Sequence, residues 1–276
     1  MRRLPAGYLA ALVVACVVGP AVLPLDPFGV DPAARLLGPS LGHPLGTDAL
    51  GRDLLVRLLL GGRVSLWVAA VATFAAVGIG GAVGLVAGYF GGWLDAALMR
   101  VTELFLAVPK LPLLVLLAAV DPVRAGLPVG PLGLLIGIIA AFGWMSAARL
   151  ARAAALPLRD ADFVRAARGF GAGPLHVIRA HLLPHAAGPL LVAATLDLGE
   201  FIIYENVLSF LGLGVPAPDP SWGSLLAEAF VHLERAPVLV IAPGLLTFLT
   251  VAAFNRLGDH LRDALDVRGA TASRTE

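Results

Sequence analysis

The chain alternates long apolar runs with shorter polar segments. Six of these runs are long enough to cross a membrane as helices, because the hydrocarbon core requires roughly 20 helical residues. They cover residues 7–25, 66–90, 101–120, 132–150, 188–210 and 237–257. This pattern predicts an all-α membrane protein with six transmembrane helices. Glycine is frequent in the second run and favours close helix packing over a direct pore-lining role; these glycines are Gly78, Gly80, Gly81, Gly84 and Gly88.

Composition supports the membrane assignment. Of the 276 residues, 58% are hydrophobic and 14% are charged, and the mean hydropathy is +0.87. A soluble domain is nearer to roughly 45–50% apolar and about 25% charged. The net charge of +1 gives no reason to expect nucleic-acid binding. The apolar stretch continues past Cys16, so the first run is interpreted as a retained span rather than a cleaved signal segment.

The distribution of basic residues predicts the orientation of the spans. With the N-terminus inside, 13 basic residues fall in inner segments and 6 in outer segments. Inner loops of membrane proteins carry the excess of arginine and lysine, so both termini are expected in the cytoplasm. The long outer segment 26–65 weakens this bias because it carries four arginines.

The polar segment between the fourth and fifth runs has more order than a connecting loop needs. Over residues 151–187 it reads ARAAALPLRDADFVRAARGFGAGPLHVIRAHLLPHAA. We expect a helix over 159–170, a break at Gly171, and a second short helix from about Gly171 to Ala180 that ends before Pro184. The second helix would lie nearly parallel to the membrane. This order favours a cytoplasmic docking element, and the alternative is a plain solvated basic loop.

Acidic residues interrupt the fifth run. Asp197, Glu200 and Glu205 lie within it, and Lys110 lies in the third run. A carboxylate at this depth costs a few kcal/mol unless it faces water or a partner. Asp197 and Glu200 are three residues apart and share a helix face. The four residues Asp197, Glu200, Glu205 and Lys110 are candidates to line a translocation path, in which Asp197 and Glu200 would favour a cationic group. The alternative is that Asp197 and Glu200 form structural pairs with Lys110 or with another subunit.

Catalytic and nucleotide-binding motifs are missing from the sequence. Lys110 is the only lysine and does not follow a glycine-rich turn, which excludes a Walker A loop. If the protein takes part in ATP-driven work, another chain binds the ATP. The six histidines have no ligand spacing typical of a metal site. We therefore predict no bound cofactor and no catalytic residue.

Five blocks of sequence carry a family resemblance. They are HPLGTDALGRDLLVRLLLGGRVSL at 43–66, AGYFGGWLDAALMR at 87–100, FVRAARGFGAGPLHVIRAHLLPH at 163–185, LSFLGLGVPAPDPSWGSLLAEA at 208–229 and FNRLGDHLRDALDVR at 254–268. With these blocks in this order, the chain resembles the inner-membrane permease subunits of ABC importers, in the dipeptide, oligopeptide and nickel branch. That resemblance implies a bacterial inner-membrane permease for di- or oligopeptides, or for nickel or another small solute.

The resemblance also implies an organisation and a set of coupling residues. Residues 1–65 would form an N-terminal span and extracytoplasmic segment, 66–268 the permease domain with its coupling loop at 151–187, and 269–276 a cytoplasmic tail. The residues expected to couple to an ATPase are Arg165, Ala166, Ala167, Gly171, Ile178, Leu183 and Pro184. The family motif opens with Glu-Ala-Ala, whereas this chain has Arg165 in place of the glutamate.

The expected partners follow from the same resemblance. They are a second permease subunit, two cytoplasmic ATPases that hold ATP and Mg²⁺, an extracytoplasmic binding protein and the membrane lipid. Segments 43–65 and 211–236 would face the binding protein, and Trp222 is interpreted as an interfacial anchor. Two other functions are compatible with a polytopic membrane protein. A secondary transporter predicts inverted repeats, which the sequence does not display, and a non-transporting assembly protein leaves the ordered 151–187 segment without a purpose.

Overall fold

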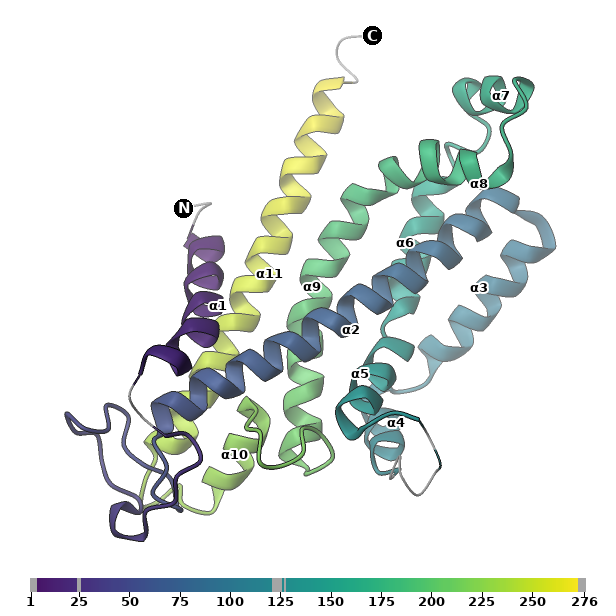
Figure 1. Ribbon diagram of the computed structural model, residues 1–276. Helices are drawn as coiled ribbons and strands as arrows, with labels where there is room; N and C mark the ends of the chain where they lie inside the picture. Colours follow the sequence, from purple (N-terminus) through teal and green to yellow (C-terminus); the bar gives the residue numbers. More distant parts are fainter. Residues whose placement is uncertain (1–3, 24–25, 121–125, 127, 273–276) are drawn as a thin grey trace. The chain divides into compact units, whose positions relative to one another are not determined.

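The computed structural model describes residues 4–23, 26–120, 126 and 128–272, with side chains described up to residue 265. Within these ranges the chain is helical and contains no strand, only an isolated bridge between Thr47 and Asp53. The helices are α1 Leu4–Val22, α2 Leu54–Phe90, α3 Gly92–Ala107, α4 Lys110–Ala118, α5 Pro131–Ala141, α6 Trp144–Ala155, α7 Asp162–Gly169, α8 Pro174–Val177, α9 Leu183–Phe210, α10 Trp222–Phe230 and α11 Val238–Ala272 (Figure 1). The all-α prediction is confirmed.

Within the part of the chain that the structure describes, five helical stretches are long and apolar enough to cross a membrane. They cover Leu4–Val22, Leu54–Phe90, Pro131–Ala155, Pro174–Phe210 and Val238–Leu265. A sixth span results if α3 and α4 are counted together, although they bend by 83° at their junction. The bend has a local cause: Val108 is extended (φ −85, ψ 132) because it precedes Pro109, which disfavours helical backbone at the preceding residue.

Two predicted spans are longer in the structure than their apolar runs. Helix α2 begins at Leu54 rather than 66, and the Asp53 carboxylate accepts the Val56 N–H (3.0 Å) at its start. Helix α11 continues to Ala272 through a charged stretch that hydropathy alone does not assign to a span. The whole of the predicted tail 269–276 lies outside the described side chains, and residues 273–276 are not described at all.

The chain divides into two compact units, and α2, α4, α5, α9 and α11 contribute residues to both. The first unit comprises Met1–Val71, Leu114–Ile138 and Leu198–Phe254, and the second comprises Ala72–Leu113, Ile139–Asp197 and Asn255–Glu276.

In the second unit, α2 packs closely on α6 through small residues. Gly80, Gly84 and Gly88 recur every four residues on α2, and Ala147, Ala151 and Ala155 do so on α6. A methyl group added at Gly80 or Gly84 would lie 2.8 Å from the Cβ of Ala147 or Ala151, and one at Gly88 would lie 2.6 Å from that of Ala155. Glycine is therefore required for this approach, which supports the packing interpretation over pore lining.

In the first unit, the Trp222 side chain is fully buried. Its indole N–H donates to the Leu58 carbonyl (3.0 Å), and its ring occupies the space above Gly62, where an added methyl group would approach it to 2.8 Å. The interpretation of Trp222 as an interfacial anchor is therefore wrong. An anchor needs its ring at the membrane surface, whereas here the missing side chain of Gly62 opens an interior position for it.

Candidate functional site

The corner between α7 and α8 forms the first candidate site. Helix α7 carries Asp162 in its first turn and Arg168 in its last, in agreement with the helix dipole. It ends in a Schellman motif, since the Gly171 N–H donates to the Arg168 carbonyl (2.9 Å) and the Ala172 N–H donates to the Ala167 carbonyl (3.0 Å). Gly171 adopts φ +87, a left-handed conformation that side chains disfavour. The predicted glycine break is confirmed.

The second half of the segment departs from the prediction. Helix α8 starts at Pro174, but it continues through a π-turn at Ile178–Leu182 directly into α9 (Figure 1). The expected separate helix over 171–180 and the expected stop at Pro184 are therefore wrong. Within the π-turn the Leu183 N–H donates to the Ile178 carbonyl, five residues back. This wider turn accommodates Pro184, which has no N–H and would clash with the carbonyl of an ordinary helical turn.

Apolar and aromatic contacts fix the corner to the rest of the second unit. Val164, Val177 and Leu182 are buried in one cluster with Tyr89. The Arg168 guanidinium lies over the Tyr89 ring, 4.7 Å from its centroid. On the other side, Phe163 stacks on the imidazole of His185 at 5.9 Å. These contacts hold the corner against α2 and α9.

The outer surface of the corner presents side chains with few contacts. Among the predicted coupling residues, Arg165, Ala166, Gly171, Leu183 and Pro184 are exposed, and Ala167 and Ile178 are half-buried. Phe170 is 93% exposed, and Leu175 is also exposed. A shallow hollow is lined by Ala167, Phe170, Gly171, Ala172, Gly173 and His176. Sequence reasoning missed Phe170, although an aromatic residue before a glycine break was a visible signal.

The predicted polar residues of the membrane spans occupy different surroundings. Glu205 is fully buried and accepts hydrogen bonds from the hydroxyls of Ser65 and Ser209, both at 2.6 Å. Asp197 is buried, and Glu200 accepts a hydrogen bond from the Tyr204 hydroxyl.

The buried cluster around Glu205 extends to the first residue of α10. Lys110 is the first residue of α4. The Ser65 hydroxyl also accepts the Trp222 N–H (3.2 Å). Glu205 therefore connects α2, α9 and the start of α10. A path-lining role for the four predicted residues stays a prediction.

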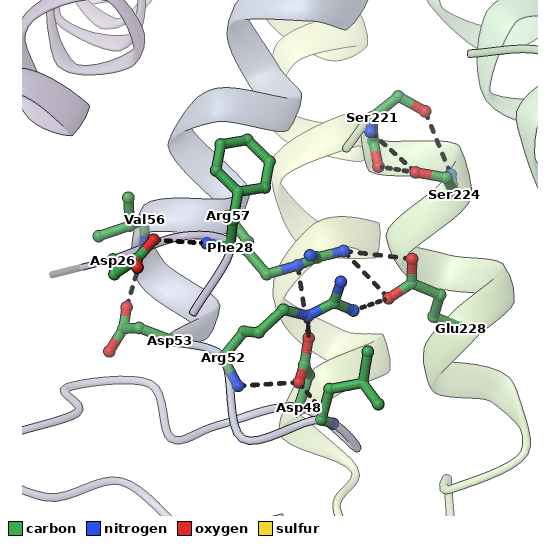
Figure 2. A network of polar contacts seen from close by, with 11 residues as sticks. Asp26, Phe28, Asp48, Arg52, Asp53, Val56, Arg57, Ser221, Ser224 and Glu228 are labelled. Carbon is green, nitrogen blue, oxygen red and sulfur yellow. Dashed lines mark hydrogen bonds and ion pairs between the residues drawn. The ribbon is translucent and has the colours of Figure 1, made fainter. Parts of the chain in front are cut away.

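A third group of polar residues was not anticipated from the sequence. Arg57 is only 1% exposed, and its Nη2 donates to both carboxylate oxygens of Glu228, at 3.1 and 3.0 Å (Figure 2). Arg52 joins the same carboxylate (2.7 Å) and also Asp48 (2.6 Å). This network links α10 to the first turn of α2 and to the segment before it. The one sequence signal for this network is the mixture of acidic residues and arginines over 48–57.

Comparison with known proteins decides the family. Residues 80–268 match the family described as "Binding-protein-dependent transport system inner membrane component". The chain belongs to this family. It is a multi-pass inner-membrane permease component and is not itself catalytic, as the sequence resemblance predicted.

Individual relatives agree with the family. The permease is 38% identical over 236 residues to the dipeptide transport system permease protein DppC of Alkalihalophilus pseudofirmus, covering 86% of this chain and 75% of the relative. It is 37% identical over 268 residues to the oligopeptide transport system permease protein OppC of Mycobacterium tuberculosis, covering 96% and 90%. A structure of the MetNI methionine ABC transporter in inward-facing conformations matches with a TM-score of 0.55 at 23% identity, covering 74% of this chain and 95% of that one. That match shows a shared fold.

Proposed function

We propose that the permease is a subunit of an ATP-driven, binding-protein-dependent importer of di- or oligopeptides. The names of its relatives support the peptide substrate. The observation that carries the ATP-driven mechanism is the α7–α8 corner. It is anchored by Val164, Val177 and Leu182, yet it exposes Phe170 and Arg165 outward. An exposed aromatic residue on a rigid, basic corner suits insertion into a cleft of another protein.

The proposed assembly has a second permease subunit, two cytoplasmic ATPases and an extracytoplasmic binding protein. ATP and Mg²⁺ would be held by the ATPases. Both termini of the permease would lie in the cytoplasm, together with the α7–α8 corner. Because α8 continues into α9 without a break, a displacement of the corner would be transmitted along a helix that enters the membrane. A continuous helix would transmit such a displacement more directly than a separate surface helix would.

The polar residues of the spans are given distinct proposed roles. Asp197 and Glu200 share a face of α9 and, with Lys110, would contribute to the path. Glu205 would act on the path indirectly, since both its oxygens are held by serines of its own unit.

The test uses proteoliposomes that contain the permease co-expressed with its candidate partners. Gly171→Asp alters the left-handed residue of the Schellman motif, and Gly38→Asp adds the same charge at an exposed loop glycine with open space around it. We expect the first variant to assemble and hydrolyse ATP without peptide uptake, and the control to behave as wild type. Peptide uptake that persists in the first variant and needs no ATPase would overturn the proposal in favour of a secondary transporter.

A further inference from the structure

Helices α3 and α6 lie side by side (Figure 1). Each carries a stripe of regularly spaced residues that includes charged ones. Asp95, Met99 and Glu103 recur every four residues along α3, and Arg149 and Arg152 are three apart on α6. At one end of the stripes the Arg152 guanidinium binds the Asp95 carboxylate in a bidentate pair, with Nη2 2.6 Å from Oδ2. This pair holds Arg152 in a fixed orientation.

Next to this ion pair the two helices leave a half-open groove. Its volume is about 470 Å³, and it is lined by Met99, Glu103, Arg149, Arg152 and Ala153. Pockets for small molecules measure roughly 300–1,000 Å³, so the groove has room for one. All five lining residues belong to the second unit.

Two groove residues of opposite charge are available to a ligand. Arg149 is exposed and forms no ion pair with any residue that the structure describes. Glu103 pairs with Arg100 at 3.2 Å, but both side chains are largely exposed, at 62% and 76%, so this pair is weak and easily exchanged. The groove therefore offers one cation and one anion, with Arg152 already neutralised by Asp95.

Both charged residues lie in helices that can cross the membrane, which argues against an ordinary solvated surface at this position. Arg149 lies in the candidate span Pro131–Ala155, and Glu103 lies in the bent α3–α4 pair that can form another. An arginine or acid facing lipid inside a span is costly, so such residues usually face water, a partner or a substrate. A simple anion would be drawn to Arg149 and repelled by Glu103. A molecule with both an ammonium and an oxyanion satisfies both.

We propose, on the basis of the peptide-import function proposed above, that this groove binds the free termini of a short peptide. The ammonium group of the peptide contacts Glu103, and its carboxylate contacts Arg149. Recognition through the termini accepts any side chains, because every unmodified peptide carries both charges. The groove is a site for the zwitterion within the permease itself, separate from any site on a binding protein. The headgroup of phosphatidylethanolamine shares this chemistry, and the test separates the two.

The experiment measures binding of radiolabelled alanyl-phenylalanine to the intact, binding-protein-free transporter in nanodiscs of phosphatidylcholine and phosphatidylglycerol. Glu103→Gln and Arg149→Gln should each weaken binding about tenfold, the loss expected for one charged contact. The N-acetylated dipeptide should bind wild type and Glu103→Gln equally, and the C-amidated dipeptide should bind wild type and Arg149→Gln equally. Glu234→Gln and Arg256→Gln, which remove exposed charges outside the groove, serve as matched controls.

Each alternative outcome identifies what has failed. If the variants lose thermal stability but bind the dipeptide as wild type does, Glu103 and Arg149 stabilise the fold and do not bind the peptide. The groove proposal is then overturned. If phosphatidylethanolamine added to the nanodiscs abolishes dipeptide binding, the groove is a lipid site and the proposal is likewise overturned. ATP-driven peptide uptake by the wild-type complex is measured in parallel. Its absence would refute the peptide-import function, whereas its presence with unchanged variants would refute the groove alone.

Discussion

The interaction of Arg57 with Glu228 gives a quantitative prediction for Glu228→Gln. The substitution keeps the shape of the side chain and removes its charge. Arg57 is 1% exposed and cannot regain water without opening the structure, whereas Glu228 is 48% exposed. Loss of the carboxylate charge therefore leaves a buried guanidinium under-compensated, and Arg52 loses the same partner at 2.7 Å.

The size of the effect follows from the geometry of the network. Removing one partner of a fully buried ion pair costs about 3–5 kcal/mol. The cost is smaller here because Glu228 is half-exposed and Asp48 remains 3.4 Å from the Arg57 Nε. We expect Glu228→Gln to lower the free energy of unfolding by about 2 kcal/mol. Arg57→Met should cost less, since Glu228 keeps Arg52 and its contact with water.

The assay is a denaturant titration of the purified permease in detergent micelles, followed by tryptophan fluorescence. The buried Trp222 lies in the same unit as the network and reports its unfolding. Arg100→Gln is the control: it breaks the exposed pair with Glu103 and should change the free energy by less than about 0.5 kcal/mol. The double variant Arg57→Met/Glu228→Gln should be no less stable than Arg57→Met alone. Additive losses, or a Glu228→Gln effect no larger than that of the control, would refute the reasoning.

Three further predictions concern packing, the buried serine cluster and the corner. Gly84→Ala should destabilise the permease by about 2 kcal/mol in the same titration, because the new methyl group would lie 2.1 Å from the Ala148 carbonyl oxygen and 2.8 Å from the Ala151 Cβ. Gly78→Ala, which has nothing within 4 Å, should not destabilise it, and equal effects would contradict the packing argument. Glu205→Ala should lower the free energy of unfolding by about 3 kcal/mol in that titration, because it leaves a cavity and two serine hydroxyls without their acceptor. An unchanged free energy would rule out a structural role for Glu205. Phe170→Ala should leave stability unchanged, since the ring is 93% exposed, but should lower peptide-uptake rates in proteoliposomes at least several-fold; unchanged uptake would remove Phe170 from the coupling surface.

Sequence reasoning located the features that depend on local signals. Apolar runs mark the spans because every membrane helix must satisfy its own backbone hydrogen bonds and bury apolar side chains in lipid. The break at Gly171 was predictable for a similar reason, since only glycine readily adopts the left-handed end of a Schellman motif. The order of five sequence blocks identified the family that the comparison then confirmed.

Other features depended on contacts between distant parts of the chain. The π-turn that carries the helix past Pro184 has no simple sequence mark, and Trp222 is buried because Gly62, far away in the sequence, leaves room for it. The pairing of Arg57 with Glu228 joins residues 171 positions apart. Likewise, the alignment of the charged stripes on α3 and α6 required both helices to be in place.

The sequence by itself thus determined which apolar segments form the membrane helices, where the α7 helix ends and which family the chain resembles. The tertiary structure decided which face of each helix is covered and which charges meet. The physical reason is that hydropathy and glycine propensity act over one or two turns of backbone. The partner of a buried charge, or the space for an indole ring, is instead set by whichever distant segment packs against it.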